Sequence, residues 1–188
     1  LQVFEPRYHN LVADIRGGDN RFGVVLIERG HEVGGGDQRT AIGTIAEIVR
    51  SGETEDGRIL VVAVGRDRIR VVQWLEDDPY PLAVVEPFPE TDDTELLEPL
   101  LARTAAARRR LLALAVEMGA TGQSIDLDLP DDFEQASWAL CAAAPIGPFD
   151  QQTVLELSGA SERLMRLEQL LTEQIDVLNA ALRANRDS

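Results

Sequence analysis

The sequence opens with LQVFEPRYHNLVADIR at residues 1–16 and continues, after a short turn, with RFGVVLIE at residues 21–28. Pro6 suits the first position of a helix, where its missing N–H is not needed. Four side chains then share one helical face at intervals of three and four: Tyr8, Leu11, Val12 and Ile15. This stretch therefore predicts a short helix that ends at Gly17 and leads into a strand.

The rest of the first half is rich in β-forming residues. Strands are predicted over residues 21–28, 41–49, 59–64, 69–74 and 82–86. Glycines indicate a flexible loop at 30–37, a hairpin connection at 51–57 and a short turn at 65–67, while Gly43 within a strand indicates a bulge or a close backbone approach. Five or six short strands with tight connections predict an antiparallel, partly closed barrel.

From about residue 91 the pattern becomes helical. Caps are predicted at Asp92 and Asp93, Asp131 and Asp132, Asp150 and Ser161. The first of these helices is expected to direct a row of side chains to a core: Leu97, Leu100, Leu101, Leu111, Leu114, Ala115 and Met118. The last is the longest, with a leucine-rich stripe from Leu164 to Leu182. We therefore predict an α+β protein, with a β-domain at residues 1–90 and a four-helix subdomain at 91–188.

The order of several motifs resembles the amino-terminal substrate-binding domain of Lon proteases. The motifs are FEPRY at 4–8, GTIA at 43–46, GRDRIRV at 65–71, AVVE at 83–86, ASWALCAAAPI at 136–146 and ERLMRLEQLL at 162–171. The resemblance implies a PUA-like β-domain followed by helices, without ATPase or protease domains. Lon-type domains carry one more strand before the FEPRY helix and Leu1 is not an initiator Met, so we expect the sequence to be a trimmed form.

By this resemblance, the expected function is recognition of an unfolded or extended polypeptide, or of an adaptor protein, in protein quality control. The candidate binding residues are Phe4, Glu5, Arg7, Tyr8 and Arg68. They would form a polar and aromatic edge of a peptide groove, or an exposed strand edge would pair with the peptide. The structural alternative is that Glu5 or Arg7 ties the first helix to the barrel, that Tyr8 fills the core, and that the strand arginines face solvent.

The residue content argues against an enzyme. None of the 18 basic side chains is a lysine, so the Ser–Lys dyad of a Lon peptidase and the lysine of a phosphate-binding loop cannot form. The two histidines, His9 and His31, lie in no hydrolase motif, and His9 is expected to be a solvated surface residue. With one cysteine, Cys141, expected to be a small buried hydrophobe, we predict neither a metal site nor a cofactor.

The net charge of −15 argues against nucleic-acid binding, which needs a basic surface. The only dense basic run is Arg108, Arg109 and Arg110, on a predicted helix. No apolar run reaches the roughly 20 residues of a membrane span, and we expect a cytoplasmic protein with basic or apolar peptide partners. The alternatives are a regulator that binds a small molecule or nucleotide, an RNA-binding PUA-like domain and, less favoured, an unrecognised hydrolase.

Overall fold

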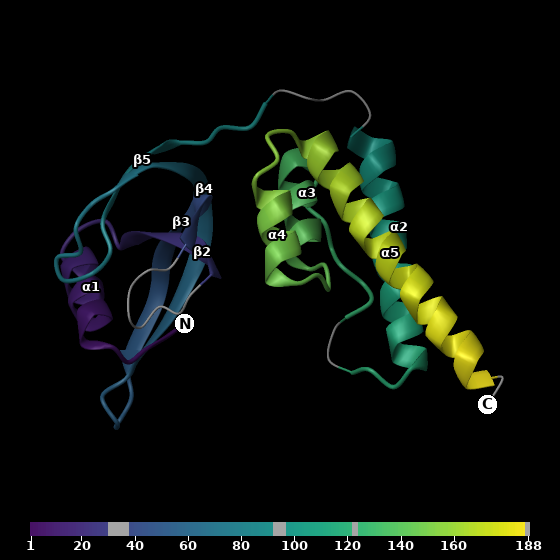
Figure 1. The fold of residues 1–188 in the computed structure, drawn as a ribbon, viewed down its shortest axis with the longest axis horizontal. Coiled ribbons are helices and arrows are strands. Elements are labelled where there is room, and N and C mark those ends of the chain that lie inside the picture. Colours follow the sequence, from purple (N-terminus) through teal and green to yellow (C-terminus); the bar gives the residue numbers. More distant parts are fainter. Residues whose placement is uncertain (30–37, 92–96, 122–123, 187–188) are drawn as a thin grey trace. The chain divides into compact units, whose positions relative to one another are not determined.

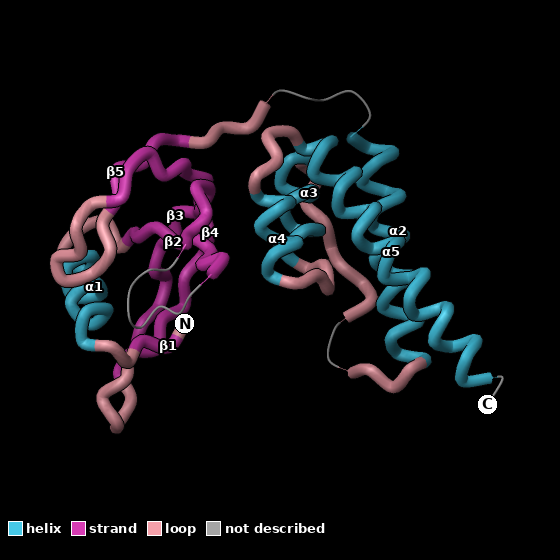
Figure 2. The backbone as a smooth tube through the Cα atoms, in the orientation of Figure 1, coloured by secondary structure: helices cyan, strands magenta, loops and turns pink. Residues whose placement is uncertain are grey.

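A computed structural model describes residues 1–29, 38–91, 97–121 and 124–186. The chain forms two compact units, Leu1–Pro89 and Glu90–Ser188, which we call the β unit and the helical unit. The predicted α+β class, an antiparallel sheet followed by helices, is confirmed. The elements are β1 (Gln2–Val3), α1 (Pro6–Arg16), β2 (Arg21–Arg29), β3 (Gln38–Glu53), β4 (Ile59–Trp74), β5 (Ala83–Pro87), α2 (Leu97–Glu117), α3 (Phe133–Ala142), α4 (Pro148–Leu155) and α5 (Ala160–Arg186) (Figures 1 and 2). The predicted loop at 30–37 and the predicted caps Asp92 and Asp93 lie outside the described residues.

The sheet of the β unit is antiparallel, with β4 and β3 at its centre. Its strands follow the order β1-β4-β3-β2, and β5 also pairs with β4. Because β3 occupies one edge of β4, β1 and β5 share the other edge: β1 pairs at its start and β5 near its end. Among the described residues, no pairing joins β2 to β1 or β5, so the sheet stays open on that side.

The expectation for Gly43 is confirmed as a close backbone approach. A Cβ atom at this position would lie 2.4 Å from the carbonyl oxygen of Val24 and 2.6 Å from a methyl carbon of Val25. No real side chain tolerates such distances to backbone, so only glycine allows β2 and β3 to pair here. The register Val25 with Gly43 depends on this position.

The predicted turn at residues 65–67 is wrong. Residues 59–64 and 69–74 belong to one strand, β4, which runs for 16 residues alongside β3. The glycine and polar residues instead accompany a register shift, where Thr44 pairs with Arg68 but Ala46 pairs with Gly65. A β-bulge uses the same residue types as a turn and keeps the strand direction, so composition could not distinguish the two. For the same reason β3 extends to Glu53, into the predicted hairpin connection.

The interior of the β unit lies between α1 and one face of the sheet. Val12 of α1 packs with Ile48, Ile59 and Val61, and Val3, Ile15, Phe22 and Ala63 border this small core. In β4, the alternation of buried Ile59 and Val61 with exposed Leu60 and Val62 follows the two faces of a strand. The predicted amphipathic helix at 6–16 therefore forms and packs its stripe inward.

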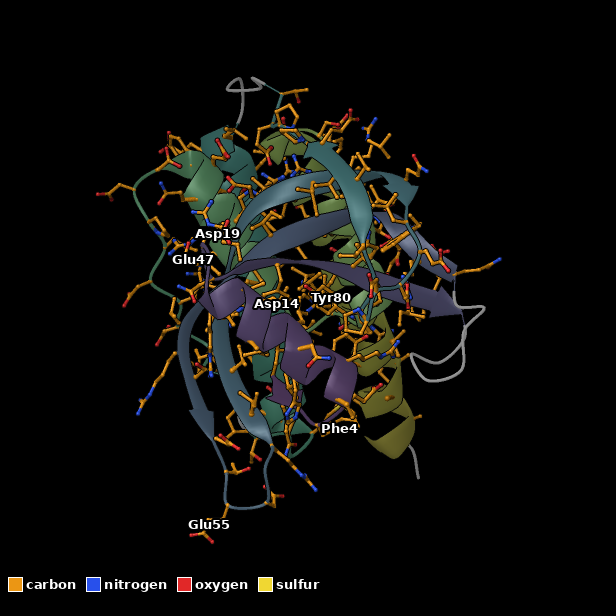
Figure 3. The ribbon with its side chains drawn as sticks, turned by 90° about the vertical axis from the view of Figure 1, so that its left-hand side faces the viewer. Phe4, Asp14, Asp19, Glu47, Glu55 and Tyr80 are labelled. Atoms are coloured by element: carbon orange, nitrogen blue, oxygen red, sulfur yellow. The ribbon has the colours of Figure 1, made fainter. Side chains whose placement is uncertain are left out.

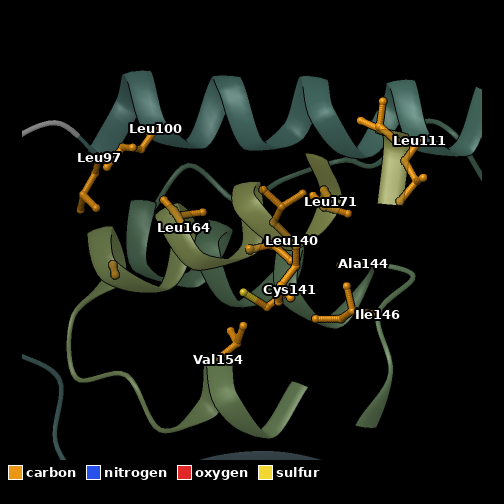
Figure 4. Close-up of a cluster of buried hydrophobic side chains, with 14 residues drawn as sticks. Leu97, Leu100, Leu111, Leu140, Cys141, Ala144, Ile146, Val154, Leu164 and Leu171 are labelled. Carbon is orange, nitrogen blue, oxygen red and sulfur yellow. The ribbon is translucent and has the colours of Figure 1, made fainter. Parts of the chain in front are cut away.

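The helical unit has a much larger core. Fourteen buried side chains pack together, most of them from α2, α3 and α5 (Figure 4). Helices α2 and α5 run along each other, and α3 and α4 pack on them (Figure 1). The predicted stripe of α5 is confirmed from Leu164 to Ile175, and Cys141 is buried as expected, which raises the pKa of its thiol to about 12.

Three local expectations in the helical unit are wrong. Gly147 is the N-cap of α4, so Asp150 lies inside the first turn instead of capping it. Ser161 is the second residue of α5 and is buried, because this helix starts one residue earlier, at Ala160. Met118 is exposed, because α2 ends at Glu117 and Gly119 then adopts a positive φ of 90°. Asp132 does cap α3, accepting a hydrogen bond of 2.8 Å from the backbone N–H of Gln135.

A polar cluster lies inside the helical unit. The Arg163 side chain is 0% exposed and its guanidinium lies 3.5 Å from the ring centre of Trp138. It donates to the carboxylate of Glu90 at 3.0 Å and to the Ser137 hydroxyl at 3.0 Å. A buried arginine is stable only when paired and hydrogen-bonded, so this cluster holds the first residue of the unit against α3 and α5.

Candidate functional site

A cavity of about 550 Å³ opens between α1 and the inner face of the sheet. We call it the α1 cleft. Its walls come from β1, α1 and inward-facing residues of all four longer strands. The lining is mostly apolar, including Phe4, Phe22, Val61, Ile69, Trp74 and Val85. Because the small core of the β unit fills only part of the space under α1, the cleft exposes apolar surface inside the unit.

Polar contacts hold α1 against the connection between β4 and β5. The Tyr80 hydroxyl donates to Asp14 Oδ2 at 2.9 Å, and this hydrogen bond raises the pKa of Tyr80 (Figure 3). The Arg7 guanidinium lies 3.9 Å from Asp77, and Arg16 at the end of α1 donates to the Ser51 hydroxyl at 2.6 Å. These contacts tie both ends of α1 to other elements, so the helix forms a fixed wall of the cleft.

The structure brings three of the five candidate residues into the cleft. Phe4, Glu5 and Tyr8 line it, because the extended segment before α1 and the first turn of the helix pass along its rim. Arg7 is not part of the lining: its Nε lies 3.0 Å from Glu5 Oε2, and its guanidinium lies 4.8 Å from the Tyr8 ring centre. The pairing between Arg7 and Glu5 is local, and the binding role of these residues stays a prediction.

Arg68 lies apart from the α1 cleft. Its guanidinium is 4.5 Å from the ring centre of Phe88 and donates to the carbonyl of Pro89 at 3.5 Å. Arg70 lies 4.9 Å from the same ring, and Arg66 pairs with Glu47 at 3.0 Å, which lowers the pKa of Glu47. These contacts give the strand arginines structural partners on the β unit.

Sequence reasoning missed the far wall of the cleft. Trp74 and Val85 line it from β4 and β5, and the Arg39 guanidinium lies 4.6 Å from the Trp74 ring centre. These residues are distant in sequence and meet only because β3, β4 and β5 pair. The alternation of apolar residues in residues 69–74 gave the strand, but nothing in it indicated which face would line a cavity.

The expectation of a solvated His9 is wrong. Among the described residues, its Nε2 atom is buried and has no hydrogen-bond partner. His9 precedes Val12 by three positions, and Val12 is the buried residue of α1, so His9 borders the buried side of the helix. The other histidine, His31, lies outside the described residues.

The dense basic run is not a continuous basic surface. Arg108 is buried and donates to three backbone carbonyls, those of Ala143 at 2.9 Å, Ser124 at 3.0 Å and Ile125 at 3.0 Å. Burial lowers the pKa of this guanidinium. Arg109 and Arg110 remain exposed. The run thus contributes one of its three charges to the fold of the helical unit.

Two further observations concern ions and membranes. Within the described ranges, no group of three or more His, Cys, Asp or Glu side chains is arranged to hold a metal ion. Over the same part of the chain, no helix combines the length and the apolar character that crossing a membrane requires.

Comparison with known families bears on the cleft. The model of the family described as the ATP-dependent protease La (LON) substrate-binding domain matches residues 1–173, which include the whole β unit and most of the helical unit. The chain belongs to this family. The resemblance to the Lon amino-terminal domain is thereby confirmed, and the α1 cleft lies within a Lon substrate-binding domain.

Individual relatives match at moderate identity. Lon protease 2 of Herpetosiphon aurantiacus is 30% identical over 138 residues, which is 73% of this chain and 17% of the relative. The Lon protease of Dictyoglomus thermophilum is 26% identical over 192 residues, which is 96% of this chain and 23% of the relative. The chain thus spans between 17% and 23% of the length of these two relatives.

Solved structures share the fold. The Lon N-terminal domain protein of Xanthomonas campestris superposes with a TM-score of 0.61 at 24% identity, covering 89% of this chain and 85% of that structure. The N-terminal domain of the Mycobacterium avium complex Lon protease gives a TM-score of 0.58 at 17% identity, covering 92% of this chain and 89% of that structure. At these identities the structures support the fold of the Lon domain.

Proposed function

We propose that this chain is a non-catalytic module that binds extended, apolar-rich polypeptide in the α1 cleft, for protein quality control or together with an adaptor protein. The observation that carries the proposal is the cleft, about 550 Å³ with a mostly apolar lining, in a member of a substrate-binding domain family. Its volume falls in the range of roughly 300–1,000 Å³ that ligand sites occupy. Apolar side chains of an unfolded segment fit such a lining because their burial releases water.

The charged groups of the cleft favour a polypeptide over a small polar ligand. Three charged side chains line it, Glu5, Arg21 and Arg39. Glu5 pairs with Arg7 at 3.0 Å and Arg21 lies 3.3 Å from Glu47, so two of these three charges already have partners in the β unit. A regulator of small polar molecules would need polar groups that converge on the ligand. The alternative of a nucleotide-binding regulator therefore has less support.

Binding of an unfolded peptide tests the proposal. We expect weak binding, because ordering a flexible ligand offsets much of the gain from apolar contact. The net charge of −15 should favour a peptide that carries Lys or Arg over its charge-reversed version. This preference should weaken as salt shortens the Debye length from roughly 8 Å at physiological ionic strength. Fluorescence anisotropy with both labelled peptides at two salt concentrations measures this.

Matched phenylalanine variants locate the binding site. Phe4 lines the cleft and is 66% exposed, so Phe4→Ala should weaken peptide binding by roughly five- to tenfold with little change in stability. Phe149 in the helical unit is 59% exposed, so Phe149→Ala is the same chemical change away from the cleft and should leave binding unaltered. Equal effects of the two substitutions, or tight binding of single-stranded RNA with no peptide signal, would refute the proposal.

We also expect the purified chain to lack protease and ATPase activity. With no lysine among its 188 residues, it cannot supply the Ser–Lys dyad or the phosphate-binding lysine on which the Lon reaction depends. Assays of casein cleavage and ATP hydrolysis on highly purified protein measure this. Activity that survives purification and disappears with one point substitution would show that a different catalytic site exists.

A further inference from the structure

The edge of β4 that faces away from β3 has a gap. β1 covers it at Ile59 and Leu60, and β5 covers it from Ile69 onward. The backbone N–H and C=O groups of Leu1 bond to Val61 at 2.7 and 2.9 Å, and the N–H of Phe88 bonds to the Arg68 carbonyl at 3.0 Å. Between these contacts, residues 62–67 have no strand partner on this edge among the described residues.

The gap has the dimensions and direction of a strand position. Six residues at roughly 3.3 Å each give a length of about 20 Å. β1 and β5 both run antiparallel to β4, so they fix the direction of any strand placed between them. In an antiparallel pair, residues alternate in the edge to which their N–H and C=O groups point. Val61 points to the β1 side, so Ala63 and Gly65 direct their backbone groups into the gap.

The gap opens onto the α1 cleft. Residues at both ends of the gap line the cleft: Leu1 and Val61 at one end, Ile69 and Val85 at the other. Val61 and Ala63 pack with the small core under α1, so this face of β4 is the inner face. A strand in the gap would therefore direct every second side chain toward the cleft and the others outward.

We propose that the bound polypeptide adds a strand to the sheet, antiparallel to β4 along residues 62–67, with apolar side chains at alternate positions entering the α1 cleft. This inference rests on the proposed polypeptide binding and specifies how it occurs. Backbone hydrogen bonds to Ala63 and Gly65 supply affinity that does not depend on sequence, and the cleft selects apolar side chains at every second position.

A single extended chain fits the gap better than a second copy of this protein. The gap is bounded at both ends by the protein's own β1 and β5, so the edge of another sheet, with its own neighbouring strands, would collide with them. Arg66 and Asp67 are exposed charged residues within the gap, and charges on an edge disfavour pairing between two sheets. Only a lone strand avoids both obstacles.

N-methylated peptides test strand addition. The probe is a capped, fluorescein-labelled octapeptide of alternating Val and Thr with an Arg at each end, and two derivatives are N-methylated at either set of alternate residues. One set points its N–H groups to β4 and the other points away. We expect one derivative to bind about tenfold or more weakly than the parent peptide, because two or three hydrogen bonds are lost. The other should stay within about twofold of the parent.

Hydrogen exchange on the unmodified protein gives an independent readout. With saturating parent peptide, the amides of Ala63 and Gly65 should exchange more slowly, because they acquire bonds in the gap. The amides of Val62 and Val64 serve as internal controls, since these residues direct their backbone groups to β3 and should change little.

The outcomes separate this inference from the proposed function. Equal binding of the two N-methylated derivatives, with the parent still bound, would overturn strand addition and leave side-chain binding in the cleft. No binding of the parent would refute the proposed function itself. Dimerisation of the protein in the absence of peptide, with Ala63 and Gly65 protected, would assign the gap to a second copy. Loss of peptide binding in a form extended before Leu1 would assign it to the chain's own residues.

Discussion

Glu90→Ala is expected to lower the free energy of unfolding of the helical unit by about 3–5 kcal/mol. Glu90 is the acidic partner of Arg163, with contacts of 3.0 Å and 3.3 Å to its two terminal nitrogens. After the substitution, the guanidinium keeps only the Ser137 hydroxyl and the Trp138 ring while it remains 0% exposed. An uncompensated buried charge is among the costliest defects in a folded protein.

Denaturant unfolding, followed by circular dichroism, measures this loss. The control is Glu162→Ala, which removes an exposed carboxylate beside Arg163 on α5 and should change stability by less than about 0.5 kcal/mol. Adding Arg163→Met to Glu90→Ala should recover part of the loss, because no buried charge is left without a partner. A loss below about 1 kcal/mol for Glu90→Ala would mean that water reaches the guanidinium and that the cluster is not a structural requirement.

Leu171→Ala is expected to cost about 2–5 kcal/mol. Leu171 is 0% exposed in the middle of α5 and belongs to the large core of the helical unit (Figure 4). Truncating it removes apolar contacts and leaves a cavity that fourteen closely packed side chains cannot readily fill. The effect should appear as a lower denaturant midpoint with an unchanged slope.

Val177→Ala is the control on the same helix. Val177 is 67% exposed, so its truncation should change stability by less than about 0.5 kcal/mol. If the stripe around Leu171 were instead a surface for a partner helix, Leu171→Ala would leave stability nearly constant and reduce self-association. Size-exclusion chromatography alongside the unfolding curves distinguishes the two results.

The secondary structure could be predicted from local residue order in most places. Pro6 and the spacing from Tyr8 to Ile15 specify α1, and the leucine spacing specifies most of α5, because each depends on contacts within a few turns of one helix. The order of the motifs also indicated the Lon domain family, since FEPRY and its followers lie at characteristic places along the chain. The absence of lysine excluded the Lon catalytic chemistry without any structure.

Long-range contacts determined what local patterns could not. The glycine and arginines at 65–68 read as a turn, and only the continued pairing of β4 with β3 showed a bulge. Arg108 and Arg163 read as surface charges on helices, yet both are buried among partners that come from other elements. A residue type reports its own preference, whereas burial depends on which distant segments pack over it.

The α1 cleft is the clearest case of this difference. Phe4, Glu5 and Tyr8 were found from the sequence because they adjoin one recognisable motif. Trp74 and Val85 were not, because they join the same wall only through pairing of β4 with β5. Periodicity shows that a strand has two faces, but which face borders a cavity depends on how completely α1 and the sheet fill the space between them, and that is a property of the packed chain.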